Sequence, residues 1–280
     1  MKEKTKQLMR NFYGKVIPIL LLTFCIMLTS ISVTSVNAKE KVYSYSSKTK
    51  TLTINIKGKM KYNCENAPWK DVEQPEHIVL KKGVTSISVC GFLGTPSQSE
   101  SYWNYNHKIK TVKLPNTLKV IDDYAFAFCT SLEKVNIPKS VKSIGWRSFI
   151  ESGLKTITIP PKVKKISSSA FANCNSLKSI TLKKGVKIIG GGAFDECESL
   201  SKVKIPNSVT EISYGAFGNC KRLKEVTLPK SVKKIGKLAF GYKDKKTKHI
   251  RVKGFTIKGY KGTAAEKYAK KNKFKFIALD

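Results

Sequence analysis

The chain has 280 residues, of which 41% are hydrophobic and 26% are charged, a composition that argues against a disordered protein. Lys and Arg number 53 against 19 Asp and Glu, which gives a formal net charge of +34. A field of this strength attracts anionic partners such as wall polymers, acidic glycans, anionic lipid or nucleic acid, and it also keeps a protein soluble.

Residues 1–38 have the pattern of a secretory signal peptide. A basic start is followed by an apolar run over residues 16–28, and Val36 and Ala38 stand at positions −3 and −1 of a cleavage site. The apolar run is too short for a permanent span of a bilayer core of about 30 Å. An uncleaved signal anchor is the alternative. We expect cleavage after Ala38, a secreted or cell-surface location, and no transmembrane anchor in the mature chain.

Residues 39–75 are predicted to form an N-terminal β-hairpin cap. The segment 42–60 alternates apolar and polar positions, with Leu52, Ile54 and Ile56 on one face, as strands of a hairpin do. Such a cap is needed where repeats stack, because the last apolar rung must be covered.

A repeat of about 23 residues runs through the middle of the chain. Its phenylalanines recur at spacings of 23, 22, 23, 23 and 23: Phe126, Phe149, Phe171, Phe194, Phe217 and Phe240. An isoleucine stands five residues before each, and a short Leu-x-x-Val-x-Ile-Pro run gives a strand that its proline ends. One unit cannot bury its apolar face alone. We therefore predict a β-rich solenoid over residues 76–245, with the repeated Leu, Ile, Val and Phe in its core.

The repeat L-x-x-V-x-I-P-x-x-V-x-x-I-G-x-x-A-F-x-x-C resembles the BspA-like class of bacterial leucine-rich repeats over about residues 76–245. The segment 51–60 with Ala67-Pro68-Trp69, and the segment 255–269, are similar to the flanks of that family. The resemblance implies a secreted or surface protein, with adhesion or the binding of host molecules as its usual inferred role.

An insertion at about residues 94–108 separates Ile87 from Ile121, which lie 34 residues apart instead of 23. It combines rigid aromatic rings with adaptable polar groups, a mixture that favours recognition. The candidate recognition loop is Tyr102, Trp103, Asn104 and Tyr105. The alternative is that Trp103 packs with Trp69 and seals the N-terminal end of the solenoid.

A lysine recurs at the position after the hydrophobic residue of the repeat turn. We call this set the lysine column: Lys119, Lys142, Lys164, Lys187 and Lys233, interrupted by Thr210. If units stack in register, neighbours lie about 5 Å apart and repel by about 0.8 kcal/mol per pair in water. A solvated surface is one interpretation, and a polyanion lying along the column is the other. Nucleic acid is disfavoured, because no aromatic residues are interleaved and the protein is expected to be exported.

Four cysteines stand three residues after the repeat phenylalanine: Cys129, Cys174, Cys197 and Cys220. Free buried thiols are favoured, although the distance between rungs does not exclude disulfides. The absence of a CxxC motif and of a nearby histidine argues against a metal site. Cys64 and Cys90 lie off this ladder and are the candidate disulfide of an exported protein.

Residues 246–280 are predicted to form a small α/β C-terminal cap. Thr263 can cap a short helix over residues 264–271, with strands on either side around Phe255 and Phe274.

No catalytic motif is present. His77, His107 and His249 are scattered, and the carboxylate pairs Asp122/Asp123 and Glu196/Glu198 fall on repeat turns, where we interpret them as solvated. We predict no enzyme, no metal and no cofactor. Two hypotheses remain: a module that binds an extracellular protein or glycan, and a structural surface protein held by charge to anionic cell-wall polymers without a specific ligand.

Overall fold

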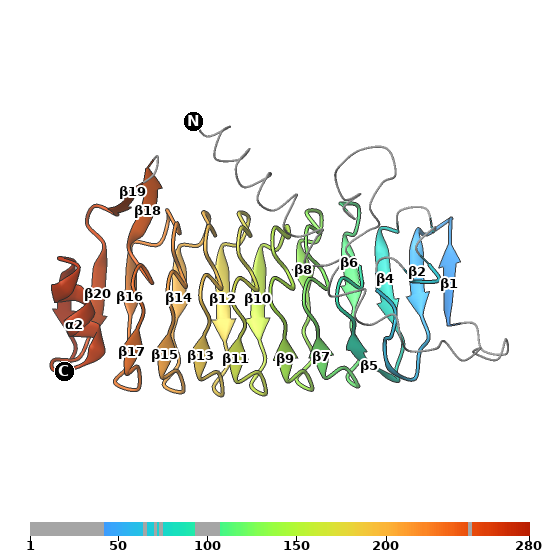
Figure 1. Cartoon of the computed structure of the whole chain (residues 1–280), viewed down its shortest axis with the longest axis horizontal. Helices are drawn as coiled ribbons and strands as arrows, with labels where there is room; N and C mark the ends of the chain where they lie inside the picture. The colour runs from blue at the N-terminus through green and yellow to red at the C-terminus, as the bar shows by residue number, and fades with distance from the viewer. Residues whose placement is uncertain (1–41, 64–65, 70–71, 73–74, 93–106, 246–247) are drawn as a thin grey trace.

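The computed structural model describes residues 42–63, 66–69, 72, 75–92, 107–245 and 248–280. Over these residues the chain coils into a solenoid of about nine turns, each of about 23 residues. Figure 1 shows the turns as an elongated stack, with β1 at one end and α2 at the other. The predicted fold class is confirmed. The segment 1–38 and the candidate recognition loop lie outside the described residues.

Each turn contributes one strand to a first wall of the solenoid. The first part of this wall comprises β1 (Tyr43–Ser46), β2 (Thr51–Ile54), β4 (His77–Leu80), β6 (Thr111–Lys113) and β8 (Lys134–Val135). The second part comprises β10 (Thr156–Ile159), β12 (Ser179–Leu182), β14 (Lys202–Lys204), β16 (Glu225–Thr227), β20 (Thr256–Gly259) and β21 (Lys275–Ala278). From β2 onward the pairings are parallel.

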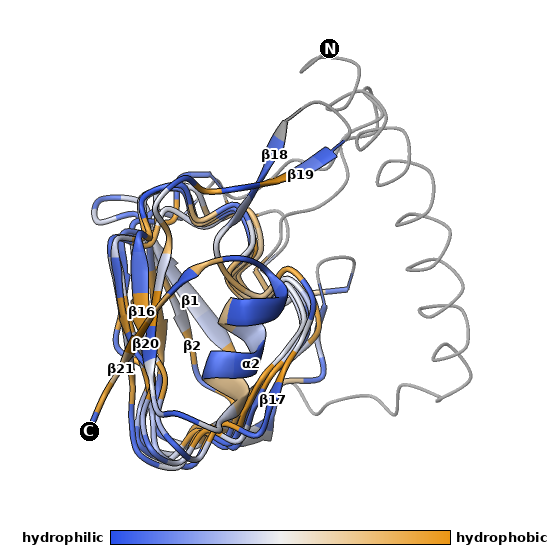
Figure 2. Ribbon diagram, turned by 90° about the vertical axis from the view of Figure 1, so that its left-hand side faces the viewer, coloured by the Kyte–Doolittle hydropathy of each residue, from blue (hydrophilic) through white to orange (hydrophobic). Residues whose placement is uncertain are grey.

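A second wall is made of shorter strands, also in parallel. It comprises β3 (Gly58–Lys59), β5 (Val84–Ile87), β7 (Val120–Ile121) and β9 (Ser143–Ile144), then β11 (Lys165–Ile166), β13 (Ile188–Ile189), β15 (Glu211–Ile212) and β17 (Lys234–Ile235). Turns close the coil between the walls. Figure 2, along the solenoid axis, shows the walls facing each other across the interior.

The register places equal repeat positions side by side. Ile157 pairs with Ile180, which pairs with Val203. Inward and outward side chains alternate along β10 and β12: Ile157 and Ile180 are buried, and the threonines next to them in the sequence are exposed. A residue type that recurs in the sequence therefore becomes a row along the solenoid.

The repeat phenylalanines form a continuous stack through the core. From Phe92 to Phe240, neighbouring ring centroids lie 4.9–5.4 Å apart with small interplanar angles. Trp69 stacks on Phe92 at 6.4 Å at the N-terminal end. At the other end, Tyr268 meets Phe240 edge-on, and its hydroxyl is hydrogen-bonded to the backbone N–H and carbonyl of Phe240.

The two ends differ in how they close. The antiparallel β1–β2 hairpin begins the N-terminal end, and β2 already pairs in parallel with β4, so stacking starts before residue 76. At the C-terminal end, the hairpin of β18 (Tyr242–Lys245) and β19 (Lys248–Arg251) projects from the stack. The helix α2 (Ala264–Lys271) and β21 complete the cap, but the Thr263 hydroxyl donates to the carbonyl of Tyr260 rather than capping the helix.

Candidate binding surface

The lysine column lies along one corner of the solenoid, and all five of its side chains are exposed. Backbone hydrogen bonds join its members directly: the N–H of Lys142 donates to the carbonyl of Lys119, and that of Lys187 donates to Lys164. Thr210 continues the row in the same way between Lys187 and Lys233. These bonds hold the backbones of Lys119 and Lys142, and of Lys164 and Lys187, one rung apart, about 4.8 Å along the stack. Lys187 and Lys233 are two rungs apart, with Thr210 between them.

Little negative charge offsets the column. Lys165 and Lys234 follow its members in sequence, and Lys234 is paired with Glu211 at 3.1 Å. Lys233 donates to the carbonyl of Lys230 at 3.1 Å. A row of neighbouring like charges relaxes when an anionic polymer lies along it, so this corner has the charge and the linear geometry to hold one.

The other sequence-predicted site residues are placed only in part. Tyr102, Trp103, Asn104 and Tyr105 lie outside the described residues, and so does Cys64. Cys90 is buried beside the turn that carries Tyr124, and its N–H donates to the carbonyl of Asp123. The recognition loop and the Cys64–Cys90 disulfide therefore stay predictions.

The cysteines of the repeat form a ladder of free, buried thiols, as predicted. Three of them donate to the carbonyl oxygen of a phenylalanine in a preceding turn, each at 3.2 Å: Cys174 to Phe149, Cys197 to Phe171 and Cys220 to Phe194. Burial raises the pKa of the Cys129 and Cys174 thiols to about 12. These thiols are packing residues, because the reactive thiolate is suppressed.

An acidic cluster on the turn edge corrects one sequence interpretation. Glu196 is partly buried rather than solvated. Burial, together with the nearby charges of Asp195 and Asp244, raises its pKa from 4.5 to about 7. Asn219 donates to both Asp195 and Asp244, at 3.3 and 3.2 Å, and His249 contacts Asp244 at 2.6 Å. The hairpin β18–β19 supplies Asp244 and His249, which is why the repeat alone did not reveal the cluster.

We expect Glu196→Gln to stabilise the protein at about pH 8 by roughly 1–2 kcal/mol, after allowance for solvent screening. The pKa of Glu196 is raised on folding, so its protonated form favours the folded state. This contribution is complete below about pH 4.5 and is lost as the pH rises through about 7. Thermal unfolding of both proteins over this range measures it.

The matched control is Glu198→Gln, because Glu198 lies on the same turn but pairs with Lys221 and is 44% exposed. This variant should keep most of the wild-type pH dependence, because burial, Asp195 and Asp244 raise the pKa of Glu196 more than Glu198 does. If the difference in unfolding free energy between Glu196→Gln and the wild type is the same at about pH 5 and at about pH 8, folding does not raise the pKa of Glu196.

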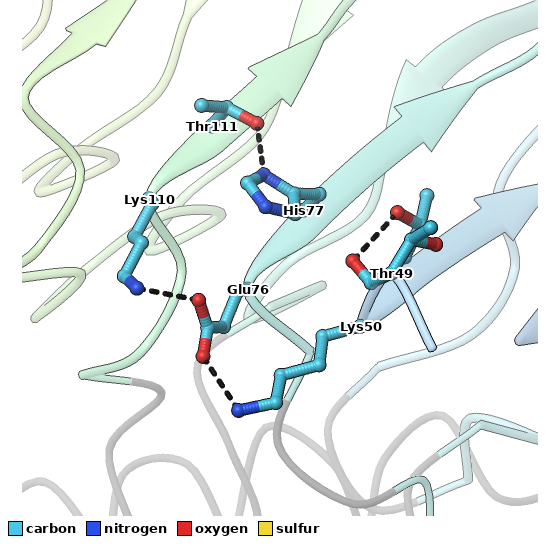
Figure 3. A network of polar contacts seen from close by, with 7 residues as sticks. Thr49, Lys50, Glu76, His77, Lys110 and Thr111 are labelled. Carbon is cyan, nitrogen blue, oxygen red and sulfur yellow. Dashed lines mark hydrogen bonds and ion pairs between the residues drawn. The ribbon is translucent and has the colours of Figure 1, made fainter. Parts of the chain in front are cut away.

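Glu76 joins three successive turns at the N-terminal end (Figure 3). Its carboxylate accepts hydrogen bonds from Lys110 at 2.5 Å and from Lys50 at 2.9 Å. These bonds, chiefly that of Lys110, lower the pKa of Glu76 to about 2. Beside it, the His77 ring and the Thr111 hydroxyl lie 2.7 Å apart. Because Lys50 and Lys110 come from the turns on either side, the network aligns the turns that flank the insertion.

A basic hollow of about 800 Å³ lies between the β18–β19 hairpin and the C-terminal cap. Arg251, Lys253 and Lys273 are among its lining residues, with Tyr242 and Phe274. The Arg251 guanidinium donates to the carbonyls of Asn272 and Lys273, so it holds the hairpin against the cap. Within the described part of the chain, no three His, Cys, Asp or Glu side chains gather as a metal site would require.

These features define a leucine-rich repeat solenoid with a basic exposed corner. The sequence matches the BspA type leucine rich repeat region, in 6 copies, over residues 96–220 and 187–260. The chain belongs to this family. Its members are usually surface or secreted proteins, and the fold typically serves as a non-enzymatic interaction scaffold.

Solved structures show the same fold at low sequence identity. A leucine-rich repeat protein from Bacteroides ovatus ATCC 8483 has a TM-score of 0.54 and 19% identity, covering 78% of this chain and 69% of that one. The leucine-rich repeat protein of T. pallidum has a TM-score of 0.52 and 20% identity, covering 88% of this chain and 100% of that one. No curated protein gives a significant match. Among the described residues, no helix has the length and apolarity of a membrane span.

Proposed function

We propose that the chain is a secreted or cell-surface protein that binds an extracellular protein or glycan, and that the lysine column contacts anionic groups of this partner. The observation that carries the proposal is the in-register row of exposed ammonium groups, in which Lys142 and Lys187 each donate a backbone hydrogen bond to the lysine of the preceding turn. Because the stack fixes the backbone positions of the column, binding a linear partner requires no rearrangement of the turns that carry it.

The alternative is a structural surface protein that anionic cell-wall polymers hold by charge, without a specific ligand. The net charge of +34 favours it. A binding screen of the secreted protein against extracellular proteins and glycans, followed by a salt series on each hit, separates the two. A saturable complex with selected partners supports specific binding. Equal binding to every polyanion, fully released by salt, supports the alternative.

The surface location depends on the signal peptide. We expect secreted protein to begin at Lys39, because Val36 and Ala38 satisfy the small-residue rule for cleavage. N-terminal sequencing or intact mass of material recovered from the medium and from the cell surface tests this. Protein that still begins at Met1 would contradict the signal peptide and support an uncleaved anchor.

A further inference from the structure

Two large aromatic side chains are exposed on the surface of the solenoid. Among the described residues, the large hydrophobic side chains that remain exposed are Trp146 at 40%, Tyr214 at 56% and Ile277 at 36%. Trp146 and Tyr214 occupy the same repeat position, two residues after Ile144 and Ile212. A single exposed ring needs no explanation, but two at one position of a solenoid share one row.

Backbone hydrogen bonds establish this row. The N–H of Arg147 donates to the carbonyl of Ser168, that of Ser169 to Gly191, and that of Gly192 to Tyr214. We call the resulting row the aromatic edge: Trp146, Ser168, Gly191 and Tyr214. Its two rings are three rungs apart, which corresponds to about 14 Å along the stack.

The backbone does not require the glycine in the middle of this edge. A Cβ at Gly191 would lie 3.4 Å from the Tyr214 carbonyl and 3.9 Å from the Ser168 hydroxyl, which are ordinary contacts. At Gly190, in contrast, an added Cβ would lie 2.6 Å from the Ile166 carbonyl oxygen. Gly192 has a φ of +58°, a conformation that favours glycine. Steric packing therefore does not account for Gly191; together with Ser168, it places two small residues between Trp146 and Tyr214 in the row.

The tryptophan ring is held in place. Tyr124 meets it edge-on at 5.0 Å, and the Arg147 guanidinium lies 4.5 Å from its centroid. Its backbone N–H donates to Asp123 at 2.6 Å. A ring fixed in this way while still 40% exposed loses little freedom when a ligand packs against it.

We propose that the aromatic edge binds a linear acidic polysaccharide. Sugar rings present C–H groups on their faces, which pack on aromatic rings, and hydroxyls on their rims, which the Ser168 hydroxyl can meet. A single row is too narrow for a protein partner, whose interface needs about 800 Å² on each side. This inference rests on the proposed function and names its ligand class.

Charge selects an acidic chain over a neutral one. Arg147 lies against Trp146, and Lys237 follows Tyr214 in the row, where its carbonyl accepts the N–H of Gly215. The row also holds one acidic residue, Asp123, which precedes Trp146 and already accepts a hydrogen bond from its backbone N–H. With the overall charge of +34, these cations favour carboxylate or sulfate groups on the polysaccharide.

The test is an array of neutral and acidic oligosaccharides of at least about four sugars, probed with the secreted protein. Calorimetry then gives the affinity of the best acidic oligosaccharide for Trp146→Ala, Tyr214→Ala and Gly191→Leu. Each variant should lose about tenfold or more, the equivalent of ~1.4 kcal/mol, the last because leucine puts a bulky side chain in the row between Trp146 and Tyr214. The matched control, Ile277→Ala, removes an exposed apolar side chain from β21 and should bind as the wild type does.

Circular dichroism checks that each variant is folded. If Trp146→Ala does not fold, Gly191→Leu and Tyr214→Ala still test the proposal. The proposal is overturned if no acidic oligosaccharide binds, if neutral ones bind equally well, or if all three variants bind like the wild type. A protein that binds an extracellular protein but no oligosaccharide overturns this proposal and leaves the proposed function standing. Failure to bind either overturns both.

Discussion

Phe171→Ala is expected to destabilise the protein by about 3–5 kcal/mol, as for other core aromatics. Phe171 is fully buried, and its ring stacks between Phe149 at 5.2 Å and Phe194 at 5.4 Å. Removing it leaves a cavity in mid-stack that neighbouring turns cannot fill, because in-register hydrogen bonds fix their separation. Denaturant unfolding followed by circular dichroism measures the loss.

The control for this prediction is Tyr214→Ala, which removes a ring of similar size that is 56% exposed. It should change stability by less than about 0.5 kcal/mol. Equal stability of Phe171→Ala and the wild type would show that the phenylalanine stack is not the core of the solenoid.

Gly153→Ala is expected to cost about 1–3 kcal/mol, the range for overpacking in a tight core. A Cβ at Gly153 would lie 2.0 Å from the carbonyl oxygen of Thr130 in the preceding turn. Gly153 lies in the unit from Phe149 to Phe171, which has 22 residues instead of 23. Both walls also break at this place, between β8 and β10 and between β9 and β11.

Gly191→Ala is the matched control, because a Cβ there makes only ordinary contacts. Thermal unfolding should show a clear decrease for Gly153→Ala and almost none for Gly191→Ala. If the two variants melt at the same temperature, the close approach at Gly153 is absent in solution.

The repeat was predictable because parallel stacking in register converts a sequence period into rows. Phe171, Cys174 and Lys164 could each be assigned to the core or the surface from one unit and then carried to the others. The same reasoning could have found the aromatic edge, since Trp146 and Tyr214 share a repeat position. They were missed because the intervening units carry Ser168 and Gly191, so no recurrence of residue type marks the row.

Features outside the repeat could not be predicted in the same way. Glu196 owes its raised pKa partly to Asp244, which the inserted β18–β19 hairpin brings to the turn edge. Glu76 pairs with Lys50 and Lys110, which are 26 and 34 residues away. Neither separation equals the regular repeat of 23 residues, so the period did not predict these pairs. Tyr268 closes the phenylalanine stack from a helix whose docking no repeat period specifies.

The proposed role of the lysine column is tested most directly by comparing two triple variants with equal charge. Lys142, Lys164 and Lys187 are replaced by Gln in one, and Lys134, Lys202 and Lys275 in the other. The second set is exposed and lies on β8, β14 and β21, which are not neighbours. Exposed substitutions of this kind cost little stability, typically within about 0.5 kcal/mol each.

The measurement is the affinity of each variant for a purified linear anionic polysaccharide, with heparin as the probe, by calorimetry at several salt concentrations. The column variant should lose about tenfold or more in affinity, and its log–log salt dependence should flatten by about 2, because three fewer cations displace counterions. The scattered variant should lose much less. Equal losses in the two variants would contradict the proposal and show that net charge alone attracts the polymer, and no loss in either would show that the basic surface serves only solubility.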